Sequence, residues 1–227
     1  MSKHLERAIE NLEREILALS ALVEDTVERA CRALHERNHT LIDEVRERES
    51  RIDQLEVHIE EECLKILALH QPVATDLRRV AAVMKINNDL ERIGDLAVNI
   101  VDRTEGISLY TDVPIPALLD RMAAAAIEMV HRALDAFVNL DSSLARAVTL
   151  QDAEIDQLNR QVIEELREFM TQRPDLAEPA LQLFSASRHI EQIADHASNI
   201  AEDVLYLIQG EIARHRHDEP ITTRPPH

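Results

Sequence analysis

Apolar residues recur along most of the chain at the three- and four-residue spacing of amphipathic helices, rather than with the alternation of half-buried strands. Prolines and short polar side chains divide this pattern into segments. The pattern predicts six long helices, at about 3–38, 40–70, 73–105, 115–139, 142–171 and 175–214. Short connections between long helices produce antiparallel bundles, so we expect an all-α fold.

Short polar side chains stand near several of the predicted helix boundaries. Asn38, Asp141 and Thr171 are of the residue types whose side chains cap helix ends or turn the chain. Beyond the last predicted helix, residues 216–227 hold three prolines among polar residues. Such a segment has too little apolar surface to fold, so we expect a disordered tail.

The pattern of the chain occurs twice. ERIGDLAVNI begins at Glu91 and EQIADHASNI begins at Glu191, and the two stretches share Glu, Ile, Asp, Ala, Asn and Ile in the same order. Upstream, ESRIDQL at 49–55 matches DAEIDQL at 152–158. Self-similarity of this kind is the signature of a tandem structural repeat.

The repeat predicts the organisation of the molecule. We expect two homologous three-helix bundles, at 1–108 and 109–215, packed with pseudo-two-fold symmetry. Each unit is long enough to bury a core of its own. The aligned apolar residues of the two repeats should be buried, among them Ile52, Ile155, Ile93 and Ile193.

Composition narrows the classes of protein that the chain can represent. The 43 acidic and 25 basic residues give a net charge of −18, which opposes binding to nucleic acid or to an anionic membrane surface. The only cysteines, Cys31 and Cys63, form no C-x-x-C pair, which favours a reducing compartment. No run of 18 apolar residues is present, and the N-terminus alternates in charge. We therefore expect a cytoplasmic protein without a membrane span or signal peptide.

An acidic stripe follows the third predicted helix and returns in the sixth. The residues at i, i+4, i+8 and i+11, roughly opposite an apolar seam, are Glu91, Asp95, Asn99 and Asp102, then Glu191, Asp195, Asn199 and Glu202. A single stripe of this kind is most simply interpreted as a solvated face. These two contain almost no Lys or Arg to offset repulsion, and their recurrence favours a binding role.

Pairs of carboxylates four residues apart fall into two repeat-related sets. The first set is Glu49/Asp53 with Glu91/Asp95, and the second is Asp152/Asp156 with Glu191/Asp195. The second and third helices of each unit are antiparallel neighbours, so the two pairs of each unit are expected to converge. Four clustered carboxylates without bases require a cation. Oxygen ligands suit Mg²⁺, Mn²⁺, Ca²⁺ or Fe³⁺ better than a soft-ligand zinc site.

These motifs carry a resemblance to a known family. The paired motifs, the near-copies NNDLERIGDLAVNI and SRHIEQIADHASNIAED, and the six-helix duplication look like the PhoU family of phosphate-transport regulators. The resemblance implies two three-helix bundles, a homodimer and bound metal, with the ion left open among iron, manganese, magnesium and zinc. The implied metal ligands are Glu49, Asp53, Glu91, Asp95, Asp152, Asp156, Glu191 and Asp195.

The resemblance also implies a role. A PhoU-like protein is expected to act as a negative regulator of phosphate homeostasis, with no catalytic activity of its own. Its expected partners are the ATPase subunit of the high-affinity phosphate ABC transporter and the phosphate-sensing histidine kinase. It would bind them by protein–protein contact, without nucleic acid and without direct insertion into the membrane.

The second unit departs from the first at four positions beside the motif. Arg188, His189, Ala194 and His196 replace Asn88, Asp89, Gly94 and Leu96. A guanidinium and imidazoles therefore stand near the second acidic set. We expect the metal preference or occupancy of the second site to differ from that of the first.

Two other interpretations of the chain remain open. Glu36/His39 and Glu128/His131 have the E-x-x-H spacing of carboxylate-bridged di-iron bundles, which makes a helical-bundle metalloenzyme the alternative function. The spacing between these two pairs does not follow the repeat. A helical adaptor without metal is the third interpretation. Metal content distinguishes the adaptor from the regulator, and enzymatic turnover distinguishes the metalloenzyme.

Overall fold

The computed structural model describes residues 3–210, which fold into six long helices and one short 3₁₀ turn. No strand occurs within this range, so the all-α fold class is confirmed. The elements are α1 (Lys3–Glu36), α2 (His39–His70), α3 (Ala74–Ile107), α4 (Ala117–Asn139), α5 (Ser142–Gln172), η1 (Pro174–Leu176) and α6 (Ala177–Gln209).

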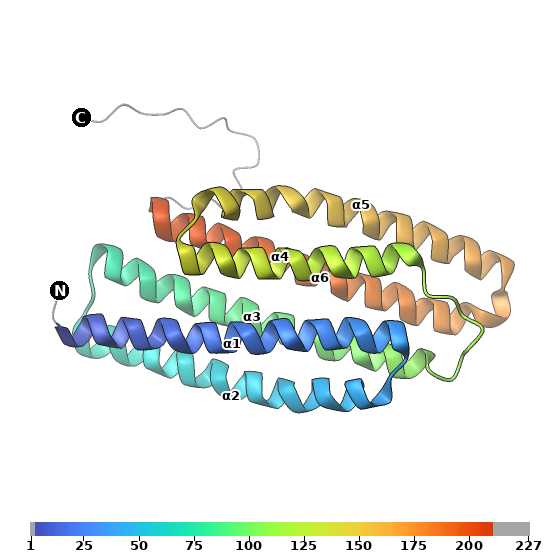
Figure 1. Ribbon diagram of the computed structural model, residues 1–227, viewed down its shortest axis with the longest axis horizontal. Helices are drawn as coiled ribbons and strands as arrows, with labels where there is room; N and C mark the ends of the chain where they lie inside the picture. Colours follow the sequence, from blue (N-terminus) through green and yellow to red (C-terminus); the bar gives the residue numbers. More distant parts are fainter. Residues whose placement is uncertain (1–2, 211–227) are drawn as a thin grey trace.

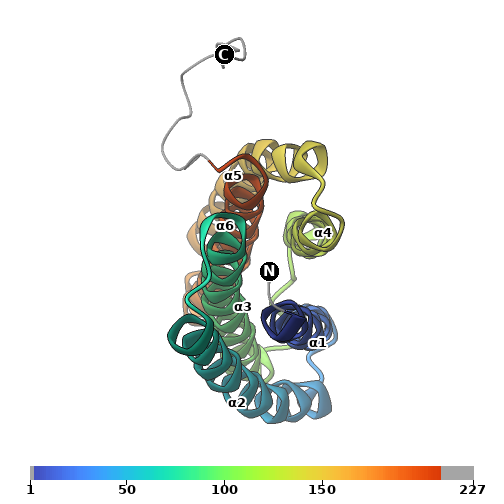
Figure 2. The same cartoon turned by 90° about the vertical axis from the view of Figure 1, so that its left-hand side faces the viewer.

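The helices form two three-helix units that lie side by side. Figure 1 shows α1, α2 and α3 in one half and α4, α5 and α6 in the other. Seen from the end, α2, α3, α6 and α5 make a curved layer, and α1 and α4 lie together against one side of it (Figure 2). The units meet mainly where α3 packs along α6, with a thinner contact between α1 and α4.

The core runs through both units. Ile52, Ile93, Ile155 and Ile193 are fully buried, as the alignment of the repeats predicts. Each unit is long enough to bury a core of its own, but the buried apolar side chains of the two units form one continuous cluster. The extensive contact between α3 and α6 joins the two halves of this cluster.

Most of the expected boundary residues act as caps. Asn38 Oδ1 accepts a hydrogen bond from the Thr40 N–H at 3.0 Å, and Asp141 caps α5 in the same way. Thr171 lies one residue before the end of α5, as expected, but its hydroxyl donates to the Arg167 carbonyl within the helix and does not cap it. The sixth helix begins slightly later than predicted, after the 3₁₀ turn. Residues 211–214 of that helix and the predicted tail at 216–227 lie outside the described residues.

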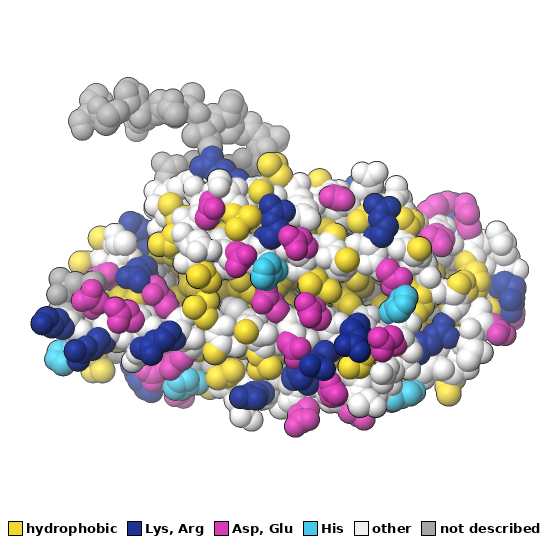
Figure 3. Space-filling model, viewed as in Figure 1, with side chains coloured by type: hydrophobic (Ala, Val, Ile, Leu, Met, Phe, Trp, Pro, Cys, Tyr) yellow, Lys and Arg dark blue, Asp and Glu magenta, His cyan; other side chains and the backbone are white. Residues whose placement is uncertain are grey.

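The surface formed by α1 and α4 carries charges of both signs. In Figure 3, acidic and basic side chains are interspersed on this face, and hydrophobic side chains follow the seam between the two helices. Between residues 3 and 210, no helix combines the length and the apolar character that are needed to cross a bilayer.

Candidate metal centres

Three carboxylates of the first unit converge at the surface between α2 and α3. Glu49 and Asp53 stand one turn apart on α2, and Asp95 faces them from α3. One oxygen atom of each side chain lies within 4.8 Å of the others. The structure therefore brings together three of the four carboxylates that were predicted as ligands in this unit.

The close approach of α2 and α3 depends on a glycine beside the cluster. A Cβ atom added to Gly94 would lie 3.1 Å from Ile52 Cδ1, which is tighter than ordinary van der Waals contact. Ile52 is fully buried. Since Gly94 precedes Asp95 and Ile52 precedes Asp53, the packing contact and the acidic cluster occupy the same turn of each helix.

The carboxylates of the first unit repel one another. Burial raises the pKa of Glu49, and the carboxylates of Asp53 and Asp95 raise it further. Burial also raises the pKa of Glu91, and Asp95 adds to this effect while Arg92 opposes it. A bound cation favours the charged form of every nearby carboxylate, so it would relieve this repulsion.

The fourth predicted ligand of the first unit, Glu91, lies outside the group of three. Arg92 Nε lies 3.5 Å from a carboxylate oxygen of Glu91, and another nitrogen of the same guanidinium lies 3.3 Å from Asp95. Arg92 was not among the residues predicted to belong to the site. Its position one residue after Glu91 and three before Asp95 was the available signal.

The carboxylates of the second unit lie farther apart than those of the first. Burial raises the pKa of Asp195 to about 6, and Asp152, Glu191 and Asp156 contribute in that order. These four groups therefore lie near one another, but no three of them in the described chain bring oxygens within 4.8 Å. Glu191 pairs with Arg188 at 2.8 Å, and its Oε2 is buried without a hydrogen-bond partner.

The two histidines beside the second set have different surroundings. His196 Nδ1 lies 2.8 Å from a carboxylate oxygen of Asp89 on α3, so this imidazole pairs across the contact between the units. Burial lowers the pKa of His189. The guanidiniums of Arg103 and Arg188 lower it further, against a hydrogen bond to Gln192.

The donor set of the first unit fits a hard cation. Glu49, Asp53 and Asp95 offer only oxygen atoms, which suit magnesium, manganese, calcium or ferric iron. No Cys or His belongs to the group, so it lacks the soft ligands of a structural zinc site. A cation held there would supply positive charge that links α2 to α3.

Within residues 3–210, the histidines of the E-x-x-H pairs belong to no cluster of potential metal ligands. Glu36 ends α1 and pairs with Arg32 at 3.2 Å, whereas His39 begins α2. His131 instead lies 2.9 Å from Glu24 on α1. Among residues 3–210, the only group of three or more potential ligands that meets the distance criterion is the acidic one.

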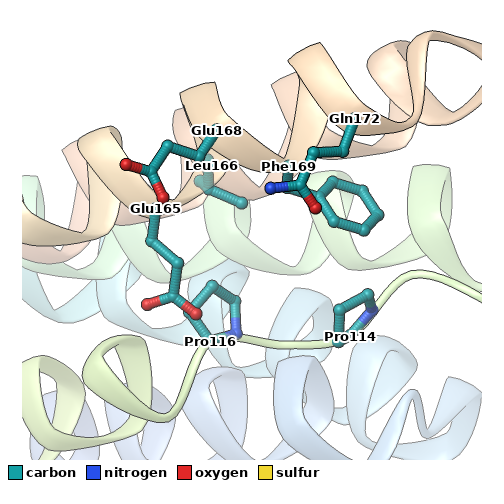
Figure 4. Close-up of a pocket in the computed structure, with 7 residues that line it drawn as sticks. All are labelled: Pro114, Pro116, Glu165, Leu166, Glu168, Phe169 and Gln172. Carbon is teal, nitrogen blue, oxygen red and sulfur yellow. The ribbon is translucent and has the colours of Figure 1, made fainter.

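A small hollow of about 190 Å³ lies between α5 and the segment that precedes α4 (Figure 4). The side chains that line it are Pro114, Pro116, Glu165, Leu166, Glu168, Phe169 and Gln172. Figure 4 shows the Glu165 carboxylate beside Pro116 and the Phe169 ring on the same side of α5. The lining offers no hydroxyl or thiol nucleophile and no histidine base, so it does not resemble a hydrolytic site.

The sequence of this chain matches the model of a known protein family. The sequence model of the PhoU domain matches residues 16–104 and matches again at 119–204. The chain belongs to the PhoU family. The double match confirms the tandem repeat, while the exact limits of the two PhoU units stay a prediction.

Relatives and solved structures agree with this assignment. The phosphate-specific transport system accessory protein PhoU homolog of Pseudomonas aeruginosa is 36% identical over 216 residues, which covers 95% of this chain and 89% of the relative. The homolog of Aquifex aeolicus is also 36% identical, with coverage of 93% and 96%.

Two crystal structures show the same PhoU fold. PhoU from Pseudomonas aeruginosa matches with a TM-score of 0.88 and 36% identity, over 91% of this chain and 99% of that one. The phosphate transport system regulatory protein PhoU from Streptococcus pneumoniae matches with a TM-score of 0.84 and 28% identity, over 92% and 99%.

Proposed function

We propose that this PhoU-family protein is a cytoplasmic, metal-binding negative regulator of phosphate homeostasis. Its relatives carry the names of accessory proteins of the phosphate-specific transport system, which supports a regulatory rather than an enzymatic role. The observation that supports metal binding is the convergence of three carboxylates from two helices, those of Glu49, Asp53 and Asp95.

The proposed mechanism is binding. Metal cross-links α2 to α3 in the first unit, and α5 to α6 in the second, as a structural clamp or a sensed ion. The second centre uses Asp152, Asp156 and Asp195 with Glu191, once Glu191 is released from Arg188. The clamped protein docks, as a homodimer, on the ATPase subunit of the phosphate ABC transporter and on the phosphate-sensing histidine kinase, and so couples transport to signalling.

Deletion of the gene tests the regulatory part. In phosphate-rich medium, the deletion strain should express its phosphate-starvation genes, because the restraint on the kinase is lost. Transcript levels in the deletion strain and in a complemented strain measure this effect. Unchanged phosphate-responsive expression in the deletion strain would contradict the regulatory role.

Metal analysis tests the ligand assignment. Replacement of the paired aspartates by Asp95→Asn and Asp195→Asn keeps the side-chain shape but removes a ligand charge from each cluster. Bound metal should fall markedly when the protein is purified without chelator or nickel resin. A variant with Asp43→Asn and Glu168→Gln, both exposed and outside the clusters, loses the same charge and should keep its metal. Equal metal in all three proteins would exclude these aspartates as ligands.

A further inference from the structure

The hollow between α5 and the segment that precedes α4 is too small for a cofactor. Its volume is about 190 Å³, whereas pockets that hold cofactors or drug-sized ligands measure about 300–1,000 Å³. Two carboxylates, an amide, two prolines and two apolar side chains line it. The hollow therefore fits one side chain of another molecule better than a whole small-molecule ligand.

The segment that lines one side of the hollow is held in place. Pro114 and Pro116 restrict their own backbone angles and have no N–H to donate. Arg37, which follows α1, donates to the carbonyl oxygen of Tyr110 at 2.7 Å and to that of Val113. Val113 is itself buried. A wall fixed in this way loses little freedom when a ligand binds, which favours binding.

The other side of the hollow carries two carboxylates without a basic partner. Glu165 and Glu168 are exposed on α5, and within residues 3–210 neither forms an ion pair. Arg167, which lies between them in sequence, pairs with Glu164 at 2.5 Å. Figure 4 shows both free carboxylates on one side of Leu166, with the ring and the amide that complete the lining on the other side. The hollow thus joins an acidic end to an apolar one.

We propose that this hollow receives an arginine side chain from an exposed segment of a partner protein. The planar guanidinium presents parallel N–H donors to the carboxylates of Glu165 and Glu168, and a lysine ammonium has no such fork. The aliphatic stem of the arginine packs between Phe169 and the two prolines. The net charge of −18 attracts a basic segment toward the protein. This inference rests on the proposed function and deepens it, because it names a place where a partner docks.

Titration of the full-length protein with an arginine peptide tests the hollow directly. The probe is the blocked tripeptide acetyl-Ala-Arg-Ala-amide, and its control contains citrulline, the neutral isostere of arginine. At constant pH and ionic strength, the ring signals of Phe169 and the side-chain amide signals of Gln172 should shift saturably in NMR spectra. The citrulline peptide should bind about three- to tenfold more weakly, because exposed ion pairs contribute modestly.

Two matched variants assign the binding to the carboxylates. Glu165→Gln/Glu168→Gln removes both charges at exposed positions and should weaken binding of the arginine peptide about three- to tenfold. Glu28→Gln/Asp43→Asn removes the same charge from exposed positions on α1 and α2 and should bind as the wild type does. The proposal is overturned if the arginine peptide causes no saturable shift or binds no better than the citrulline peptide. Equal affinity in the two variants also overturns it.

Complementation of the deletion strain connects the hollow to a partner. Glu165→Gln/Glu168→Gln, at the wild-type protein level, should leave phosphate-starvation genes expressed in phosphate-rich medium, whereas Glu28→Gln/Asp43→Asn should repress them. Full repression by the first variant would overturn the docking role. A change of its oligomeric state in sedimentation would also overturn it, because the arginine would then come from a second copy of this chain. Unchanged expression in the deletion strain would instead contradict the proposed function, and the titration would still decide whether the hollow receives arginine.

Discussion

At the scale of single residues, the absence of one side chain sets the distance between α2 and α3. Gly94 lies against Ile52, where even a methyl group would be 3.1 Å from the nearest carbon. Gly94→Val should therefore lower the free energy of unfolding by about 1–3 kcal/mol through overpacking. It should also reduce metal bound by the first centre, because Asp95 is displaced relative to Glu49. Urea denaturation and metal analysis measure the two effects.

A double variant tests whether the contact between Gly94 and Ile52 limits the approach of the two helices. Ile52→Ala alone should destabilise the protein by about 2–5 kcal/mol, because it leaves a cavity in the core. On the Gly94→Val background the same change should be milder, since the valine occupies part of that space. Strictly additive losses would show that Gly94 and Ile52 do not limit the approach of the helices.

Individual site residues were only partly predictable. The spacing of Glu49, Asp53 and Asp95 places them on facing helical surfaces, and the structure brings them together. The same spacing could not show that Glu91 lies outside this group of three, because helix periodicity fixes the direction of a side chain but not how far it reaches. It also could not show Arg92 beside two of the acids, since an i to i+3 ion pair depends on rotamers.

At the scale of the helices, a histidine links α4 to α1. His131 Nδ1 lies 2.9 Å from Glu24, and its other ring nitrogen lies 3.4 Å from Asp135. The hydrogen bond to Glu24 raises the pKa of His131, burial opposes this effect, and the charges of Glu24, Asp135 and Glu128 add to the rise. Protonated His131 is thus favoured in the folded protein.

The stability of this link should depend on pH. Since the pKa is higher in the folded state, the stabilisation is fully present below the unfolded value of 6.5 and is lost as pH rises through the folded value. His131→Asn should therefore be less stable than wild type by about 0.5 kcal/mol near pH 5.5, a small value because the pair is exposed to solvent. The difference should vanish near pH 9. Denaturation curves at both pH values measure it, and a constant difference would contradict the assignment.

The helices themselves were the most predictable part of the fold. Their starts and ends follow from prolines and from caps such as Asn38 and Asp141, which act through local hydrogen bonds. Whether the repeats bury one core or two could not be predicted in the same way. That outcome depends on the long contact between α3 and α6, and the periodicity of one helix does not identify the face it shares with a distant helix.

At the scale of the whole molecule, bound metal and net charge should act together on stability. A chain with a charge of −18 repels itself, and cations at the acidic clusters would offset part of this repulsion. Chelation should lower the melting temperature by about 5–10 °C if metal is bound at roughly a hundred times its dissociation constant. Sodium chloride should restore only part of the loss, because it screens charge without ligation.

The double variant with Asp95→Asn and Asp195→Asn provides the comparison. Its melting temperature should respond less to chelator, because fewer ions remain to be removed. Differential scanning calorimetry of both proteins, with and without chelator, measures the effect. An identical response in the two proteins would place the stabilising metal elsewhere, and no response in either would favour the adaptor without metal.

The pairing of unlike residues across α3 and α6 has a consequence for stoichiometry. In a two-fold dimer of separate units, every contact across the axis occurs twice with the same residues. Fusion of the units in one chain removes this constraint, so Asp89 meets His196 on one side while His189 takes the equivalent place on the other. The two sides of the contact between α3 and α6 are therefore chemically different. We expect a protein that docks on this chain to distinguish the two sides, and so to bind in one orientation and at one site per chain.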